Sequence, residues 1–427
     1  MKSGNILGLE LNNDFCQISY YDREKHEPKT LEVSVDNFQI PLLLGYFQDK
    51  WIYGKEAKRL QEVSAENVVT DLYSKALHQE KVEICGQVKD AVWLLAKYFQ
   101  LALHKFKNIS FLTFSVPESN IDVSNILKRI GNYIGVAKEC VFVQDFKESF
   151  CYYMFYQPKE LWQYESALFY CDRNEIRAYM LRRLKTISGR GADMFVTVDE
   201  VASAKMKELA AVYPVLNVDK VKDADERFKT FIQGVFDKKV VSSVFLTGEG
   251  FENNWYPASL KVLCNGRRAF IGNNLYSKGA CYTSYHKAKG EEDMPIYLDG
   301  TKMMEQICLR MRVHGKEGWY PIVEWGSHWY ESDGQWEVLL EDKSDIEIHI
   351  ESLATGELQA ETVSLEGLPN RKDYALRLAI ETMFLDDRTC KISFRDIGFG
   401  EFFPSSGFEV EKTIHLGGSN GQFNSLS

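Results

Sequence analysis

Long apolar runs, basic clusters and paired cysteines are all missing from this sequence of 427 residues. No window approaches the roughly 18 uninterrupted apolar residues of a membrane-spanning helix, so we expect no membrane partner. A net charge of -10 without a long basic run argues against nucleic acid as a partner, because that binding depends on clustered Lys and Arg. The nine cysteines stand singly, which favours free thiols in a reducing cytoplasm over disulfides or a zinc site.

The composition is that of an ordinary globular protein. Aromatic residues make up 13% of the chain and there are only 10 prolines, so the sequence carries enough apolar surface to fold. Its first residues hold a single early Lys and a short apolar patch broken by Glu10, unlike a secretory signal. The sequence therefore predicts a cytoplasmic protein with two or three domains.

A change of pattern divides the chain. Strand-like and helix-like stretches alternate through the first 285 residues, and the remainder contains strands and turns. The polar segment 285–295, with a Gly and a closing Pro, is the expected junction. We predict a first region at 1–285, with lobe I about 1–160 and a truncated lobe II about 161–285. A β-sandwich is expected at 295–416, followed by a flexible tail at 417–427.

Two hairpins begin matching halves of the first region. The first has strands at 5–11 and 15–21 around a polar turn of Asn12, Asn13 and Asp14, and the second spans 167–184. Helices and strands then alternate after each hairpin. A hairpin-led βββαβα unit that occurs twice is the arrangement of the actin, hexokinase and heat-shock chaperone superfamily.

Within that superfamily, the sequence resembles a reduced DnaK-type heat-shock chaperone. The matching motifs occur in the family's order at 6–11, 40–44, 52–59, 114–117, 147–150, 245–250 and 274–280. Further matches at 366–369, 378–381 and 390–393 resemble the chaperone's substrate-binding β-sandwich. The resemblance implies an α/β two-lobed actin-like ATPase fold with ribonuclease H-like halves, followed by an all-β sandwich. It also implies ATP or ADP with Mg²⁺ as ligand and a polypeptide or partner protein bound by the sandwich.

The nucleotide motifs depart from the family pattern. In the family, glycine-rich hairpin turns wrap the phosphates with backbone N–H groups. Here the first turn is Asn12-Asn13-Asp14 after Glu10, and the second carries side chains throughout 171–175. The family's lysine falls at Tyr73, with Lys75 two positions late. The resemblance assigns a catalytic role to Glu148, and cofactor contacts to Glu10, Asn12, Asn13, Asp172, Asn174, Gly248, Glu249 and Gly250.

These departures predict a site that does not hydrolyse ATP. Binding of ATP or ADP with Mg²⁺ and binding of no nucleotide stand as equal alternatives, and Arg173 with Asn174 offers a different way to hold an anion. No metal centre is predicted. The sequence does not decide whether the protein is an enzyme, but the missing phosphate-loop glycines and lysine favour the absence of ATP turnover.

Aromatic residues gather in the C-terminal region. Four of the eight tryptophans fall within 18 residues, and we consider them candidate protein-binding anchors: Trp319, Trp325, Trp329 and Trp336. Burial in the sandwich core competes with recognition, and we expect core positions for at least half of them. The segment 399–403 (FGEFF) is a second candidate surface, for which burial is expected.

The function that these features favour is chaperone-like protein interaction or peptide binding, on a scaffold with a degenerate nucleotide site. One alternative is an active ATP-dependent chaperone with altered phosphate loops. Another is an actin-like cytoskeletal scaffold.

Overall fold

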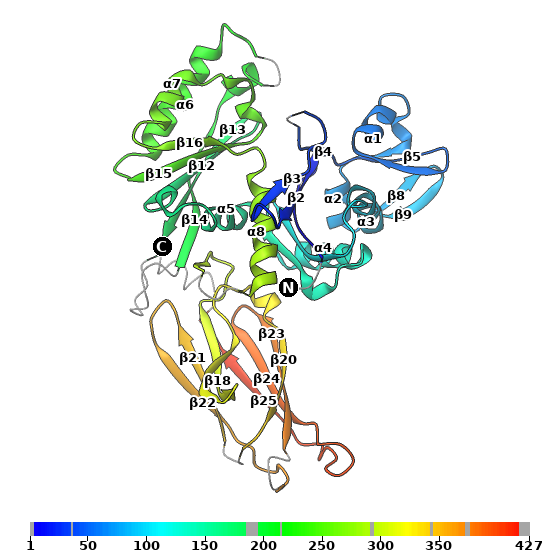
Figure 1. Cartoon of the computed structure of the whole chain (residues 1–427), viewed down its shortest axis with the longest axis vertical. Coiled ribbons are helices and arrows are strands. Elements are labelled where there is room, and N and C mark those ends of the chain that lie inside the picture. The colour runs from blue at the N-terminus through cyan, green and yellow to red at the C-terminus, as the bar shows by residue number, and fades with distance from the viewer. Residues whose placement is uncertain are drawn as a thin grey trace. The chain divides into compact units, whose positions relative to one another are not determined.

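A computed structural model describes residues 4–35, 37–184, 195–213, 216–290, 294–341, 345–371 and 376–417. The chain forms two compact units (Figure 1). Unit 1 comprises residues 1–182 and 198–294, and unit 2 comprises residues 183–197 and 295–427. Of the predicted tail at 417–427, all but Gly417 lies outside the described residues.

Unit 1 begins with a mixed sheet of order β11-β10-β1-β2-β3, in which β4 also pairs with β2. Strand β1 runs parallel to β10 and antiparallel to β2, as predicted for the first hairpin. The strands are β1 (Asn5–Leu11), β2 (Phe15–Asp22), β3 (Glu27–Thr30), β4 (Ile40–Pro41), β10 (Ile109–Val116) and β11 (Val141–Asp145). Six of the seven β1 residues are buried because helices cover both faces of this sheet.

Smaller elements are inserted between β4 and β10, and helices accompany the sheet. The small sheets are β6-β5-β7 and β8-β9. Their strands are β5 (Leu44–Phe47), β6 (Lys50–Tyr53), β7 (Val68–Val69), β8 (Lys81–Ile84) and β9 (Gln87–Asp90). The helices are α1 (Gly54–Gln61), α2 (Leu72–Leu77), α3 (Ala91–Ala102), α4 (Ile121–Tyr133) and α5 (Phe146–Phe155). Side-chain caps fix the starts of three of them: Asp90 for α3, Asn120 for α4 and Asp145 for α5.

The second sheet of unit 1 repeats the strand order of the first. Its order is β16-β15-β12-β13-β14, with β12 parallel to β15 and antiparallel to β13. The strands are β12 (Glu165–Cys171), β13 (Glu175–Arg183), β14 (Phe195–Lys205), β15 (Val241–Thr247) and β16 (Arg268–Ile271). The helices are α6 (Val221–Val235), α7 (Pro257–Leu263) and α8 (Leu275–Lys289). Each sheet has its own buried core, so unit 1 consists of two lobes with the same topology.

Helix α8 joins the lobes through very close backbone packing. A Cβ on Gly8 of β1 would overlap the backbone of Cys281, and one on Gly279 would overlap the carbonyl of Ser149 on α5. The hydroxyl of Ser284 donates a 2.7 Å hydrogen bond to the carbonyl oxygen of Leu7. Helix and sheet therefore meet through small residues, where no larger side chain fits.

Helix α8 ends inside the predicted junction 285–295, which also contains the boundary between the two units at 294–295. Residues 285–289, predicted as part of the junction, form the last helical turn. Gly290 then stops the helix with a φ of 65°, the left-handed conformation that glycine adopts readily at a helix C-terminus. In the described residues no helix is both long and apolar enough to cross a membrane. The nine cysteines all lie in the described residues, and none of them forms a disulfide.

Unit 2 contains two four-stranded antiparallel sheets of order β19-β18-β21-β22 and β20-β23-β24-β25. Side chains from both sheets form one buried cluster, as in a β-sandwich. The strands are β18 (Glu305–Val313), β19 (Lys316–Val323), β20 (Gly334–Leu339), β21 (Ile346–Ser352), β22 (Leu358–Val363), β23 (Arg377–Asp386), β24 (Thr389–Asp396) and β25 (Glu409–His415). A short strand, β17 (Ile296–Tyr297), pairs in parallel with Phe195 and Val196 of β14.

Candidate functional site

The turns of the two leading hairpins have the same hydrogen-bond geometry. In the first, the Asn12 side-chain oxygen accepts from the backbone N–H groups of Asp14 and Phe15, both at 2.9 Å. In the second, the Asp172 carboxylate accepts from the N–H groups of Asn174 and Glu175, both at 2.8 Å. Asn and Asp favour such turns because their side chains reach the backbone two residues on. In each turn, therefore, one side chain accepts hydrogen bonds from two of the turn's backbone N–H groups.

This geometry decides what the turns can do chemically. A turn binds a phosphate when several backbone N–H groups point together at the ligand. Here Asn12 and Asp172 already accept two N–H groups in each turn, and Asp172 adds a negative charge. The Asn13 side-chain oxygen also accepts from the N–H of Ser74, which ties the first turn to α2. The arrangement therefore does not fit a triphosphate, although the turns lie at the predicted positions.

Arg173, at the tip of the second turn, is held by Glu249. Its Nε donates to Glu249 at 2.8 Å, and its guanidinium lies 5.8 Å from the ring centre of Tyr213. The hydrogen bond from Arg173 to Glu249 raises the pKa of the guanidinium, and Asp14 on the first turn adds a smaller effect in the same direction. Arg173 was the residue that the sequence suggested as an alternative ligand for an anion. In the structure its guanidinium is instead paired with Glu249.

The glycines after β15 pack against the second hairpin. A Cβ on Gly248 would overlap the carbonyl oxygen of Cys171, and one on Gly250 would overlap the Cys171 sulfur. Gly248 also has a φ of 101°, which disfavours other residues. Both glycines are thus required by contacts within the protein, so their presence does not indicate a nucleotide.

A buried row of polar side chains crosses the first sheet beside these turns. Gln17, Glu10, Ser115 and Gln144 occupy paired positions on β2, β1, β10 and β11. Burial raises the pKa of Glu10 to about 8, so this carboxyl is largely protonated at neutral pH. The side-chain oxygens of Gln17 and Gln144 have no hydrogen-bond partner within the described part of the chain. Mg²⁺ is usually bound through one or two ionised carboxylates, and this row offers a single carboxyl, which is neutral in the absence of an ion.

The other predicted site residues are placed as follows. Glu148 lies in the first turn of α5, where its N–H donates to Asp145 at 2.8 Å. Tyr73 is buried in the core of the first lobe. The Lys75 ammonium donates to the carbonyl of Thr70 at 2.8 Å. No three His, Cys, Asp or Glu side chains of the described residues cluster as a metal centre would require.

The four tryptophans of unit 2 differ in burial. Trp329 and Trp336 are partly buried against the sandwich core, and Trp325 packs on a second cluster that includes Phe195. Trp319 is 39% exposed and stacks on the ring of His349, with 3.3 Å between ring centres. Of the predicted anchors, only Trp319 is therefore displayed to solvent as a large aromatic surface.

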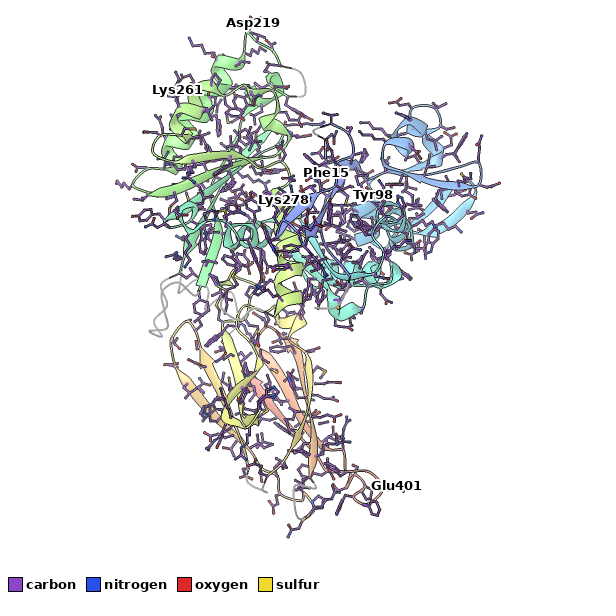
Figure 2. The ribbon with its side chains drawn as sticks, in the orientation of Figure 1. Phe15, Tyr98, Asp219, Lys261, Lys278 and Glu401 are labelled. Atoms are coloured by element: carbon purple, nitrogen blue, oxygen red, sulfur yellow. The ribbon has the colours of Figure 1, made fainter. Side chains whose placement is uncertain are left out.

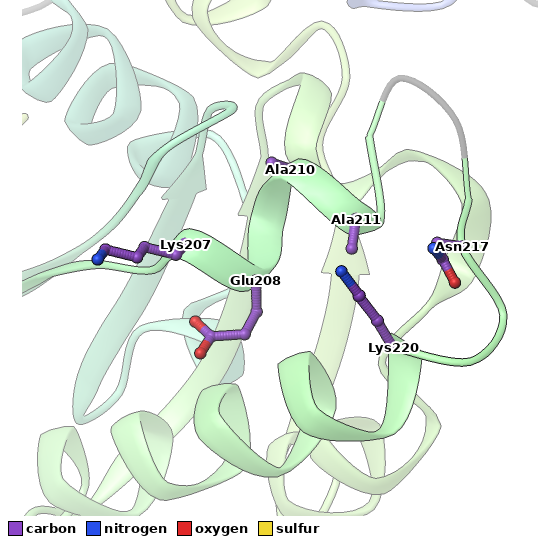
Figure 3. A pocket seen from close by; sticks show the side chains of 6 residues that line it. All are labelled: Lys207, Glu208, Ala210, Ala211, Asn217 and Lys220. Atoms are coloured by element: carbon purple, nitrogen blue, oxygen red, sulfur yellow. The ribbon is translucent and has the colours of Figure 1, made fainter.

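The hollows described on unit 1 are lined by residues outside the two hairpin turns. One hollow, of about 520 Å³, is lined by Lys207, Glu208, Ala210, Ala211, Asn217 and Lys220. In Figure 3 the Lys207 side chain extends away from Lys220, so the two ammonium groups do not converge on one ligand position. Glu208 is engaged by Arg227 at 2.8 Å. This hollow has no constellation typical of a built binding site.

Sequence reasoning did not identify the contact of Arg173 with Glu249 and Tyr213, nor the buried amides of Gln17 and Gln144. The one signal for Gln17 in the sequence was the predicted hairpin of β1 and β2. Counting back from its turn places Gln17 opposite Glu10 in the antiparallel pair.

Comparison with known proteins gives family membership without an activity. No curated protein matches the chain. Residues 302–416, which contain the sandwich strands, match a domain of unknown function (DUF8552). Residues 27–300, more than half of the chain, match the model described as family of unknown function (DUF5716) C-terminal, and the protein therefore belongs to this family.

Proposed function

We propose that this protein is a non-hydrolysing, protein-binding scaffold of the actin-like, heat-shock chaperone type. The repeated strand order of the two lobes and the crossing of α8 against both β1 and α5 support an actin-like fold. The β-sandwich that follows supports the likeness to DnaK-type chaperones. Polypeptide is then the ligand class that this architecture favours.

The single observation that carries the proposal is the matching geometry of the two turns. In both, an Asn or Asp side chain accepts the N–H groups that a phosphate would need. Acidic groups at the same place, Asp14, Asp172 and Glu249, oppose a polyanion electrostatically. The scaffold is expected to keep its conformation without nucleotide, because protein groups satisfy these contacts.

The polypeptide-binding surface that we propose is the outer face of sheet β19-β18-β21-β22. Trp319 and His349 stack on this face, and Ala360 pairs with His349 on β22. Leu358, next to Ala360 on the same face, is exposed. A flat face with a large aromatic ring offers contact area with few rotatable bonds to restrict.

The nucleotide half of the proposal predicts a negative result with a defined control. We expect no heat in a calorimetric titration with MgATP, and no phosphate release above that of buffer, because the turn N–H groups are occupied. Glu148→Gln is expected to behave as the wild-type protein does. Turnover that disappears in Glu148→Gln, with an unchanged melting temperature, would show instead an active ATP-dependent chaperone.

The binding half is tested by two tryptophan variants. Trp319→Ala should cost about 1 kcal/mol of stability or less, because the ring is exposed, whereas Trp336→Ala should cost roughly 2–4 kcal/mol by opening the core. In an assay of aggregation of chemically denatured citrate synthase, we expect wild-type protein to suppress aggregation and Trp319→Ala to lose that effect. Equal destabilisation by both variants, or full suppression by Trp319→Ala, would contradict this assignment of the surface.

A further inference from the structure

The loop between β24 and β25 displays three phenylalanines to solvent. In this loop, residues 397–408 and hereafter the phenylalanine loop, Phe402 is 91% exposed, Phe399 46% and Phe403 42%. The sequence led us to expect burial of this segment, and that expectation was wrong. Glu401, which precedes Phe402 in the sequence, is labelled in this loop in Figure 2. An exposed group of this kind is typical of an interaction surface.

The phenylalanine loop is held in one conformation by its own contacts. The buried carboxylate of Asp396 accepts from the N–H of Gly398 at 2.9 Å and from the N–H of Ser406 at 2.8 Å. Within the loop, the N–H of Phe399 donates to the carbonyl of Phe403 at 2.6 Å. A Cβ on Gly398 would overlap the backbone of Ser405. Since the loop is ordered beforehand, little conformational entropy is lost when it docks.

An apolar hollow of matching size lies on the second lobe of unit 1. It has a volume of about 190 Å³ and lies between α7 and the ends of β15 and β16. Its lining is Leu246, Asn254, Tyr256, Pro257, Leu260, Ala269, Phe270 and Ile271, of which Leu260, Phe270 and Ile271 are exposed at the surface. An apolar cavity of about 150 Å³ accommodates benzene, so this hollow can accept one phenyl ring.

The charges beside the two surfaces are complementary. Lys261 follows Leu260 on α7, and Arg268 precedes Ala269 on β16; both are exposed. Figure 2 labels Lys261 on α7 and Glu401 in the phenylalanine loop. Glu252, an exposed acid two residues before Asn254 of the lining, has its pKa raised mainly by burial and, to a smaller extent, by the charge of Glu249. Lys261 and Arg268, each next in sequence to a residue that lines the hollow, offer positive charge to a phenylalanine flanked by glutamate.

We propose that the phenylalanine loop of one molecule docks in this hollow on a second copy of the chain, with Phe402 in the hollow and Glu401 beside Lys261. A membrane surface is a poorer occupant, because Glu401 at the loop tip and the net charge of -10 oppose anionic lipid. The two surfaces differ, so each contact leaves a free loop and a free hollow, and the assembly is an open head-to-tail chain. The inference does not depend on the proposed function, since it uses neither the hairpin turns nor the Trp319 face.

Sedimentation of the full chain tests the proposal. One loop in one hollow buries far less than the roughly 1,600 Å² of a standard interface, so association should be weak, with a Kd in the range of about 10 μM to 1 mM. The average mass should rise above that of the monomer with concentration, and fall at high salt. Phe402→Asp and Leu260→Asp should each abolish the rise, whereas Phe47→Ser, which changes an exposed phenylalanine of another hairpin, should not.

Two mixing experiments make the test specific. Phe402→Asp keeps its hollow and Leu260→Asp keeps its loop, so a mixture should form dimers and nothing larger. Glu401→Lys and Lys261→Glu should each weaken association at least threefold, and the double variant should regain it. A monomer at every concentration, including one formed by docking within a single chain, overturns the proposal. The proposal is also wrong if Phe402→Asp and Leu260→Asp associate as the wild type does. A protein that stays monomeric, but floats with phosphatidylcholine vesicles and loses this binding in Phe402→Asp, would show a membrane as the occupant instead.

Discussion

Gly279→Ala is expected to destabilise unit 1 by about 3 kcal/mol or more, a large part of the 5–15 kcal/mol that stabilises a typical folded protein. The added Cβ would overlap the carbonyl oxygen of Ser149, which belongs to the backbone of α5 and has no rotamer to change. Either α8 or α5 must shift, and a shift of α8 separates it from β1. Differential scanning calorimetry should show a melting temperature lower by roughly 6–12 °C, or no folded unit 1.

Gly234→Ala is the matched control. Gly234 also lies in a helix, α6, but apart from its chain neighbours and the backbone of its own helix, no atom lies within 4 Å of the position that a Cβ would take. Alanine has the higher helix propensity, so this variant should gain up to about 1 kcal/mol. If Gly279→Ala melts as the wild type does, the lobes do not depend on close packing of α8.

The hairpins illustrate what local sequence can predict. The polar residues Asn12 to Asp14 between two apolar stretches are sufficient to predict a turn, because Asn and Asp bond to their own backbone. The repeated lobe topology follows the predicted order of elements. Whether the turn N–H groups remain available to a ligand depends on side-chain rotamers, which the pattern of residue types does not determine.

Burial and helix ends were harder to predict, for different physical reasons. A stretch such as FGEFF has the composition of a buried strand, and only the tertiary network around Asp396 turns it into an exposed loop. The polar end of α8 looks like a linker, although basic residues before a glycine also favour a helix C-terminus. Glu10 could be named from the sequence, but its protonation follows from burial in the folded lobe.

Asp396→Asn is expected to cost unit 2 roughly 3–5 kcal/mol, because it removes the charge that pairs with Arg371 inside the protein. Arg371 donates to both carboxylate oxygens, at 3.1 and 3.0 Å, and both side chains are nearly inaccessible to water. The N–H and hydroxyl of Ser406 also donate to Asp396, and an amide cannot accept from all of these donors. Glu381→Gln is the control, since its ion pair with Arg395 is exposed and should contribute less than about 1 kcal/mol.

The effect of Asp396→Asn should also depend on pH in a defined direction. Burial acts to raise the pKa of Asp396, but hydrogen bonds from Ser406, Gly398 and Arg371 outweigh it and hold the pKa below its usual value. A carboxyl with a lowered folded-state pKa stabilises the fold fully above its unfolded pKa of about 3.9, and that contribution is lost as the pH falls towards the folded pKa. In urea unfolding followed by circular dichroism, the gap between wild type and Asp396→Asn should therefore be full at neutral pH and narrower at pH values below about 4. If the difference in free energy of unfolding between wild type and Asp396→Asn is the same at both pH values, the side chain of Asp396 holds the phenylalanine loop by its packing and not by its charge.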